Sequence, residues 1–479
     1  MEYMDVPTKI RRVFDPIYGF IRLTPVEWEI IHSTFYQRLR WIKQLGFSFY
    51  LFPGAEHSRF GHSIGVMYNA HKILQSCGKA VAEGDLMEKK PANKDVEFHQ
   101  AIRLGALMHD LGTFMFSHTT EMAYIKFAET TNAKNGKGLA DDHEHLGSFI
   151  IKNTDFEGGV TNILKKYGHD PQKISDLVKG KSPSILANQI LHSEIDCDRM
   201  DYLLRDAHYT GLKYGTYDRY YLLHHFKREV VSGEEILTIK ENAVHCVSDF
   251  LSSRFNWYSQ VIRSPRGAKY DAIAEKICFY LLEKGEILKY SDLLEIIAHS
   301  PEKFYQFNDS YFMSRVQECY MKGKFDKSPA IKDMASTLLF SRGAKTIKGQ
   351  EFRQLLLNQD DFQKNYKIIK KVENKVKELT DFILKKGEEK DWIIPDLPTK
   401  EITFVKSYNK IVKDKVGPNL LLERDPVKIS FDNGDIKLLA EVENSIISSL
   451  QKTNNFIPNV FCSYSAHELL IKEGLIIED

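Results

Sequence analysis

Apolar residues recur every three or four positions along most of the chain before about residue 300, which is the spacing of one helix face. Two polar stretches, Lys79–Asn93 and Asn132–Leu139, interrupt this pattern, and we expect exposed loops there. The pattern predicts a mainly α fold. The helical segments that it marks lie at 28–45, 62–77, 99–112, 147–154, 184–195, 198–207 and 272–285.

The pattern changes towards the C-terminus. A Lys-rich helical stretch at 362–387 has Glu and Asp interleaved, which is more typical of a solvated helix face than of a nucleic-acid site. Short alternating runs follow at 401–408 and 425–439. Within the second run, Asp432-Asn433-Gly434 predicts the turn of a hairpin or of a strand–turn–helix unit.

Length and composition are those of a globular protein. The chain has 479 residues, 43% of them hydrophobic and 27% charged, and we expect a helical core at 1–300, a boundary near 300–330 and a smaller α+β region at 301–479. Its 66 Lys and Arg residues balance 65 Asp and Glu residues, so no overall charge attracts nucleic acid or an acidic membrane. No apolar run approaches the ~20 residues of a membrane span, and the N-terminus has no signal-peptide pattern. The six cysteines lack CxxC spacing, which argues against a zinc knuckle and for reduced thiols in the cytoplasm.

The dipeptide His109–Asp110 is the most informative feature of the sequence. Ile102, Ala106 and His109 recur at helical spacing, and Gly112 is a suitable stop, so the dipeptide falls at a helix end. At that position both side chains are half free of the backbone ladder and can point into a cleft.

Two further residues extend this pair. His62 upstream and Asp198 downstream complete a set of imidazoles and carboxylates, the ligands that a divalent metal takes when it works on phosphate. A second pair, His169–Asp170, shows how little the dipeptide means alone. It lies between Gly168 and Pro171, and we interpret it as a solvated loop. The alternative for the first pair is a core histidine hydrogen-bonded to a neighbouring aspartate.

Other polar residues lie at helical spacing around these positions. Arg59 is three residues before His62, so a phosphate could bridge the guanidinium and a metal. His118 and Glu121 are also three apart, and a carboxylate beside an imidazole suits a general acid or base. His143 adds another histidine.

The segment after Asp198 has a polar face of its own. Asp198, Tyr202 and Asp206 are four apart, and Arg199 adjoins the first of them. A carboxylate for metal, an arginine for phosphate and two groups for sugar hydroxyls would form one wall of a nucleotide site. The alternative is a helix with ordinary i,i+4 ion pairs.

Several motifs, in this order, resemble the HD-domain deoxynucleoside triphosphate triphosphohydrolases, which include the sterile-alpha-motif/HD host restriction enzyme and bacterial dGTPase-type proteins. The resemblance covers roughly residues 10–300, and we find no sterile-alpha-motif domain in the sequence. The C-terminal part matches only loosely, at FSRGAKTI and DPVKISFDNGD. The matching motifs are DPIYGFIRL, RLRWIKQLGFSFYLFPGAEHSRFGHSIGV, ALMHDLGTFMFSHTTE, HEHLGS and EIDCDRMDYLLRDAHYTG.

The resemblance implies an HD-domain catalytic core that hydrolyses a deoxynucleoside triphosphate to deoxynucleoside and triphosphate, by attack of water at the α-phosphorus. It implies one divalent metal ion (Mn, Fe, Mg or Ni) as cofactor. By position, it assigns metal binding to His62, His109, Asp110 and Asp198, catalysis to His118, Glu121 and His143, and substrate binding to Gln44, Arg59, Arg199, Tyr202 and Asp206.

The sequence departs from the family at three positions around these residues. Thr113 stands where some members carry a histidine that helps to protonate the leaving group, which shifts that task to His118. Ile262 and Ser264 stand where the family usually has Tyr and His, and the Tyr normally flanks the sugar.

The family also implies regulation and assembly. Its nucleotide activator site is partly kept at Gln37 and Arg40, whereas His32 replaces an acidic base-reading residue, so we expect an activator that is not strictly a guanine nucleotide. Region 301–479 would serve regulation or homo-oligomer formation. Two other functions stay open: an HD phosphohydrolase of another nucleotide (NTP, cyclic nucleotide or nucleic acid), and a nucleotide-binding sensor with weak catalysis, against which the intact His118 argues.

Overall fold

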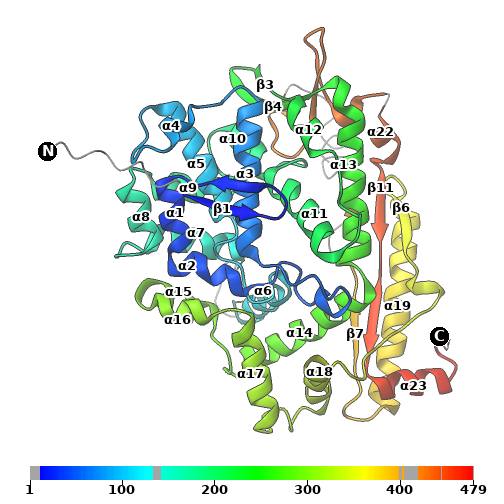
Figure 1. Cartoon of the computed structure of the whole chain (residues 1–479). Helices are drawn as coiled ribbons and strands as arrows, with labels where there is room; N and C mark the ends of the chain where they lie inside the picture. The colour runs from blue at the N-terminus through cyan, green and yellow to red at the C-terminus, as the bar shows by residue number, and fades with distance from the viewer. Residues whose placement is uncertain (1–10, 133–141, 399–401, 404–418, 444, 478–479) are drawn as a thin grey trace.

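The chain folds into packed helices with small sheets, as the apolar pattern predicts (Figure 1). The computed structural model describes residues 11–132, 142–398, 402–403, 419–443 and 445–477. A hairpin of β1 (Arg12–Asp15) and β2 (Gly19–Arg22) precedes the first helix. The helices that follow are α1 (Pro25–His32), α2 (Thr34–Gln37), α3 (Arg59–Ser76), α4 (Glu83–Leu86), α5 (Lys94–Met108), α6 (His118–Asn132), α7 (His143–Asn153), α8 (Val160–Lys166), α9 (Pro171–Val178), α10 (Ile185–His192), α11 (Cys197–Thr210), α12 (Arg219–His225), α13 (Val244–Trp257), α14 (Pro265–Glu283) and α15 (Tyr290–His299).

Local sequence explains where the first helices begin and end. Thr24 and Glu27 form a capping box at the start of α1, with Pro25 at its first position. The expected helical stretch 28–45 is broken after α1, because Ser33 has extended backbone and its hydroxyl accepts a hydrogen bond from the Tyr36 N–H. That stretch therefore consists of short pieces rather than one helix.

Three helices position the HD dipeptide. The long helix α3 packs against both α5 and α11. Their facing sides carry buried apolar residues, among them Met67, Leu107 and Leu203. Because these helices are fixed against one another by a shared core, the polar residues at their ends are fixed too.

Of the three expected loops, two differ from the prediction and one lies almost wholly outside the described residues. The stretch Lys79–Asn93 is largely exposed, but it contains α4, whose Leu86 is buried. The stretch Asn132–Leu139 lies outside the described residues from position 133 onwards. The pair His169–Asp170 does connect two helices, and Asp170 caps α9. His169, however, is buried rather than solvated, because α8 and α9 pack against each other and α9 also packs on α5 and α7.

A four-stranded sheet joins distant parts of the chain. Its order is β10-β9-β4-β3, with β4 and β9 parallel and the other pairs antiparallel. The hairpin expected around Asp432-Asn433-Gly434 is confirmed by the antiparallel pairing of β9 and β10, and Gly434 has a φ of 89°. The strands are β3 (Phe226–Val231), β4 (Glu234–Lys240), β9 (Lys428–Ser430) and β10 (Ile436–Leu438).

The C-terminal region also builds two three-stranded sheets, of order β6-β11-β8 and β5-β12-β7. The Lys-rich stretch is one helix, α19, which buries Val372, Val376, Leu379 and Ile383 and lies beside β6 and β11 in Figure 1. The remaining elements are α16 (Pro301–Gln306), α17 (Asp309–Met321), α18 (Pro329–Phe340), β5 (Lys345–Thr346), β6 (Leu355–Asn358), α19 (Phe362–Lys386), β7 (Ile393–Asp396), β8 (Ile402–Thr403), α21 (Asn419–Leu422), α22 (Ile446–Leu450), β11 (Thr453–Phe456), β12 (Asn459–Cys462) and α23 (Tyr464–Lys472).

Apolar side chains form two clusters. The larger one includes residues of α16, α17 and α18 as well as the helices before residue 300, and it continues into Ile429 and Phe461. The smaller one is built from residues 347–476. Because the larger cluster contains residues from both sides of 300–330, these clusters do not mark the expected domain boundary there, which remains a prediction. All six cysteines are free thiols, and no helix in the described ranges has both the length and the apolarity to cross a membrane.

Candidate metal centre and flanking histidines

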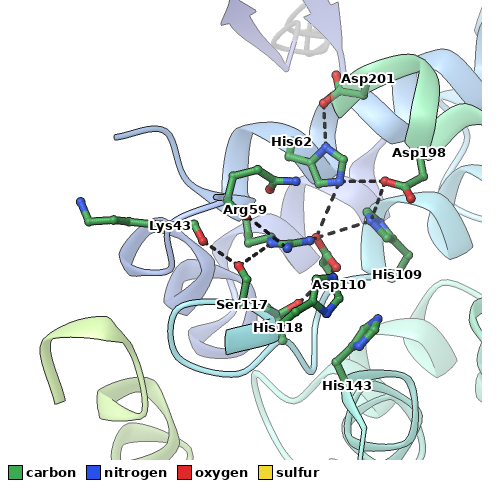
Figure 2. Close-up of polar contacts among 12 residues, drawn as sticks. Lys43, Arg59, His62, His109, Asp110, Ser117, His118, His143, Asp198 and Asp201 are labelled. Atoms are coloured by element: carbon green, nitrogen blue, oxygen red, sulfur yellow. Dashed lines mark hydrogen bonds and ion pairs between the residues drawn. The ribbon is translucent and has the colours of Figure 1, made fainter. Parts of the chain in front are cut away.

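Three side chains from three helices meet at one point (Figure 2). His62 lies in the first turn of α3, His109 follows the last residue of α5, and Asp198 lies in the first turn of α11. Asp198 Oδ1 is 3.0 Å from His62 Nε2 and 3.7 Å from His109 Nε2. All three ligand atoms lie within 4.8 Å of one another, so a single ion could contact each of them.

Asp110 brings a second carboxylate to this point. Its Oδ2 is 3.7 Å from His62 Nε2 and 3.5 Å from His109 Nε2. The same oxygen accepts a hydrogen bond of 2.8 Å from Arg59 Nη1. Burial opposes the negative charge of Asp110, but Arg59 and the two imidazoles outweigh it and hold its pKa well below the usual range. The carboxylate is therefore ionised, as a metal ligand must be.

The hydrogen bonds of the two imidazoles fit a metal ion. His62 Nδ1 is bonded to Asp201 Oδ2 at 2.8 Å, and His109 Nδ1 is bonded to the Ala106 carbonyl at 2.8 Å. Both rings consequently direct Nε2 to the centre, and the partners on Nδ1 fix the tautomer that metal binding needs. His62 Nε2 is buried and makes no hydrogen bond of acceptable geometry, even though Asp198 is near. A divalent cation would satisfy this atom.

Without a metal, protons take its place. Burial lowers the pKa of His62, but the nearby carboxylates of Asp198 and Asp201 outweigh burial and raise the pKa to about 9. A metal that binds here must displace this proton.

Gly65 lets α11 approach α3 closely enough for the Asp201–His62 bond. A Cβ atom at position 65 would lie 1.8 Å from Asp201 Oδ1 and 2.5 Å from Arg205 Nη2. Arg205 in turn binds both oxygens of Asp201, at 2.8 and 2.9 Å. The small residue thus makes room for a buried Arg–Asp–His chain that orients one ligand.

A second cluster lies next to the centre, built around Glu121. Its Oε2 binds His118 Nδ1 at 2.7 Å, and its Oε1 binds His143 Nδ1 at 2.6 Å and the His143 backbone N–H at 2.8 Å. These distances are those of hydrogen bonds. The Glu121 carboxylate is buried, whereas the side chain of His118 is 65% exposed. Glu121 therefore orients His118 from the protein interior, and the other edge of the imidazole is open to a ligand.

Glu121 also sets the charge of His143. Burial lowers the pKa of His143, but the hydrogen bond and charge of Glu121 outweigh burial and raise the pKa to about 9. The two imidazoles correspondingly hold the pKa of Glu121 well below its usual range. The cluster therefore carries a protonated histidine at neutral pH.

The turn before His118 is held in an unusual conformation. Phe116 and Ser117 both have positive φ, 50° and 57°, which side-chain-bearing residues rarely adopt. The Phe116 N–H donates to Asp309 Oδ1 at 2.6 Å, and the Lys43 N–H donates to Asp309 Oδ2 at 2.8 Å. Burial outweighs these donors and raises the pKa of Asp309 to about 7.

The same turn is tied to the metal centre. Ser117 Oγ donates to the Lys43 carbonyl at 2.6 Å and accepts from Arg59 Nε at 2.9 Å, and Arg59 continues to Asp110. Figure 2 shows this chain of contacts from Lys43 through Ser117 and Arg59 to the centre. Three N–H groups of Arg59 thus donate to the protein, and one of them holds Asp110. A role of Arg59 towards a phosphate stays a prediction.

Two glycines bring α7 to the site. A Cβ at Gly112 would lie 2.2 Å from the Gly147 nitrogen and 2.3 Å from the His143 carbonyl oxygen. The backbone after the HD pair therefore touches the first turn of α7, which carries His143. A cavity of about 90 Å³ lies beside this contact, with His109, His143 and Asp198 among its walls.

Of the residues that the resemblance assigned to substrate, Gln44 and Asp206 are buried near each other. His57 Nε2 binds Asp206 Oδ1 at 2.8 Å, and the His57 carbonyl accepts from the Gln44 N–H at 3.0 Å. Gln44 Oε1 and Asp206 Oδ2 are buried, and no residue in the described part of the chain forms a hydrogen bond with either atom.

Tyr202 and Arg199, which the resemblance also assigned to substrate, have protein contacts. The Tyr202 ring packs on Trp257, with 4.6 Å between ring centroids. Arg199 donates to the Ser193 carbonyl at 2.7 Å and pairs with Asp196. Their roles towards a substrate stay predictions.

The expected activator residues lie together on α2 and the turn after it. Gln37 Nε2 donates to the Ile31 carbonyl at 2.6 Å, and Arg40 Nε donates to Gln37 Oε1 at 2.9 Å. Arg40 also stacks over the Phe60 ring at 3.5 Å. His32, which is exposed, binds the Trp28 carbonyl.

The three departures from the family also have defined places. Thr113 is buried, and its hydroxyl donates to Asp110 Oδ1 at 3.2 Å. Ile262 ends a π-helical turn, Tyr258–Ile262, and packs against the main core, and Ser264 precedes α14.

Sequence reasoning missed Asp201 and Asp309. For Asp201 a signal existed, since it lies three residues after Asp198 and four before Arg205 on one helix. For Asp309 there was none, because the residues that it binds, Lys43 and Phe116, are far away in the sequence.

Comparisons with known proteins agree with this geometry. Residues 59–206 match the HD domain family. The chain is similar to the uncharacterized protein YwfO of Bacillus subtilis, 28% identical over 460 residues that cover 94% of this chain and 92% of YwfO. It is also 30% identical over 224 residues to the deoxynucleoside triphosphate triphosphohydrolase SAMHD1 of Homo sapiens, a match that covers 42% of this chain and only 33% of that protein.

The fold has been seen before. A crystal structure of a phosphohydrolase from Bacteroides thetaiotaomicron superposes with a TM-score of 0.62 at 18% identity, covering 95% of this chain and all of that one. Taken together, residues 59–206 are an HD domain, and the chain is similar to proteins that include deoxynucleoside triphosphate triphosphohydrolases.

Proposed function

We propose that this protein hydrolyses deoxynucleoside triphosphates to deoxynucleoside and triphosphate. The observation that carries the proposal is the meeting of His62, His109 and Asp198 from three helices, with Asp110 beside them. This mixed nitrogen and oxygen set has no thiolate, which favours an octahedral divalent ion such as Mn, Fe, Mg or Ni over a structural zinc. When bound, such an ion would neutralise phosphate charge and lower the pKa of water.

The protein's own residues would handle orientation and protons. Arg59 holds Asp110 through a buried bond, so that carboxylate keeps its direction when a triphosphate approaches. Glu121 accepts from His118 Nδ1, which leaves Nε2 to give a proton to the leaving 5′-oxygen. His143, with its raised pKa, adds a positive charge beside the phosphates. Thr113 is buried against Asp110 and cannot replace a histidine as proton donor. His118 is the exposed imidazole that would protonate the leaving oxygen.

Two buried atoms support recognition of the deoxyribose. Gln44 Oε1 and Asp206 Oδ2 are buried acceptors without partners among the described residues, and leaving such atoms unpaired costs about 1–3 kcal/mol. Sugar hydroxyls would satisfy them. The similarity to SAMHD1 supports a deoxynucleoside triphosphate as the substrate.

The test is a product analysis. Pure protein is incubated with each dNTP and each NTP in the presence of Mn²⁺, and products are separated by chromatography. Deoxynucleoside plus triphosphate supports the proposal. Diphosphate or monophosphate products would instead mean another nucleotide phosphohydrolase, and bound but unconverted nucleotide would mean a sensor. His118→Ala should lower kcat by about 10²–10⁴-fold while substrate still binds.

We further propose regulation by nucleotides in a homo-oligomer. The support is the pair Gln37 and Arg40, which are hydrogen-bonded to each other at the end of α2 and on the turn after it. Light scattering with and without nucleotides, alongside rates in single and mixed dNTPs, tests this. A monomer that hydrolyses single and mixed dNTPs at equal rates would contradict this regulation and leave only the catalytic proposal.

A further inference from the structure

A cavity separate from the metal centre lies at the other end of α3 from His62. It has a volume of about 270 Å³ and lies among β2, α3, α4 and α5. His71 in its wall is nine residues beyond His62 on α3, about 13 Å further along the helix axis at 1.5 Å per residue. The polar residues that line it are Arg22, His71, Lys72, Gln75, Glu83 and Arg103.

The cavity carries uncompensated positive charge. Arg22 pairs with Glu83 at the rim, but both side chains are more than half exposed, so this ion pair is weak. Lys72 donates to Gln75 Oε1 at 2.9 Å, and no carboxylate in the described part of the chain forms an ion pair with it. Burial, followed by the charges of Arg219 and Arg103, lowers the pKa of Lys72. Such a lysine gains from an anion.

Arg103 is a fixed donor at the base of the cavity. It is only 3% exposed, and its Nε and Nη2 bind Glu27 at 2.6 and 2.7 Å. This bidentate contact holds the plane of the guanidinium. Its Nη1 makes no hydrogen bond to any described residue, so one edge of a preorganised arginine is unused.

His71 offers an acceptor at the same place. Nδ1 of His99 faces the Lys79 carbonyl at 3.1 Å, and since a carbonyl only accepts, that nitrogen carries the proton. Nε2 of a neutral His99 is then an acceptor, and His71 Nδ1 must donate to it across 2.9 Å. Burial and Arg103 lower the pKa of both rings, which keeps them neutral. Nε2 of His71 is therefore a lone-pair acceptor.

Each aromatic ring of the cavity already has at least one cation over it. Tyr68 packs on Tyr18 with 5.2 Å between centroids, and the cations of Lys72 and Arg219 lie 5.4 and 5.3 Å from its centroid. Arg12 lies over the Phe20 ring at 4.5 Å. Tyr68 is thus in contact with two cations, whereas Phe20 is 60% exposed beside Arg12.

We propose that this cavity binds a small sugar phosphate. Lys72 and the free edge of Arg103 would hold the phosphate, and a sugar hydroxyl would donate to His71 Nε2. The volume of about 270 Å³ favours a sugar phosphate over a larger nucleotide. This inference is independent of the proposed hydrolysis.

The probe is ribose 5-phosphate, with ribose and inorganic phosphate as comparisons, measured by isothermal titration calorimetry on the full chain. We expect saturable binding of ribose 5-phosphate, weaker binding of phosphate and none of ribose. Lys72→Gln should weaken binding of ribose 5-phosphate by about tenfold or more, because a charge-assisted hydrogen bond is lost. The matched control is Lys152→Gln, an exposed lysine on α7 outside the cavity, which should bind as the wild type does.

Three results would overturn the proposal. The first is the absence of ribose 5-phosphate binding to the wild type. The second is equal binding by Lys72→Gln and Lys152→Gln, which would place the anion elsewhere, for example at the metal centre. The third is equal affinity for phosphate and ribose 5-phosphate, which would remove the hydroxyl contact with His71.

Discussion

Removing the charge of Glu121 should release the proton of His143. Glu121→Gln keeps the shape of the side chain but not its negative charge. In the wild type the pKa of His143 is about 9, against an ordinary 6.5. At about 1.4 kcal/mol per pKa unit, this difference corresponds to roughly 3 kcal/mol of preference for the charged imidazole. Since burial alone lowers the pKa of His143, we expect the variant to titrate at 6.5 or below.

The assay is an NMR titration of the histidine ring protons in the metal-free protein. The unfolding free energy offers a second readout. Because the folded pKa of His143 lies above its ordinary value, the protonated ring stabilises the fold fully below pH 6.5, and this contribution is lost as the pH rises through about 9. In Glu121→Gln, the fall in unfolding free energy over that range should be smaller.

Asp142→Asn is the matched control. Asp142 Oδ1 binds His145 Nδ1 at 2.7 Å, which is the same kind of contact on the exposed start of α7. This change should leave the His143 titration where it was. The reasoning would be refuted by a wild-type His143 that titrates near 6.5, or by a Glu121→Gln variant in which its pKa stays near 9.

Three further changes test how the surroundings support the site. Asp201→Asn should weaken binding of Mn²⁺ by about 10–100-fold by disturbing the orientation of a ligand histidine, measured by equilibrium dialysis; unchanged affinity would contradict that role. Asp309→Ala should lower the unfolding free energy by about 2–5 kcal/mol in urea denaturation, since two backbone N–H groups lose a buried acceptor, and wild-type stability would disprove it. Gly65→Ala should cost about 1–3 kcal/mol by overpacking against Asp201, whereas Gly84→Ala, where a methyl group meets nothing within 4 Å, should cost far less; equal costs would refute the steric argument.

The local sequence pattern was enough to predict the helices and part of the site. Apolar spacing marked α3, α5 and α11, and it placed His109 at a helix end, where the structure has it. The three-residue spacing of His118 and Glu121 predicted their contact. These features depend on residues within one helical turn, and the periodicity of a helix sets which of them are neighbours.

Spacing failed where a residue's surroundings come from elsewhere in the chain. His169 occupies a loop with turn residues on both sides, yet it is buried, because the packing of α8 and α9 decides its exposure. The break after α1 has a local cause instead, because one serine hydroxyl competes with the helix backbone.

Tertiary structure alone decided which groups share a partner. Glu121 serves His143 as well as His118 because α7 docks at Gly112, and no local rule relates positions 121 and 143. Asp309 reaches the turn before His118 from α17, beyond the HD domain match. The C-terminal hairpin adds its strands to β4 of the core. Such contacts join segments that are far apart in sequence, and they form only when helices bury a common apolar core. The sequence pattern can therefore name the chemistry of these side chains but not their partners.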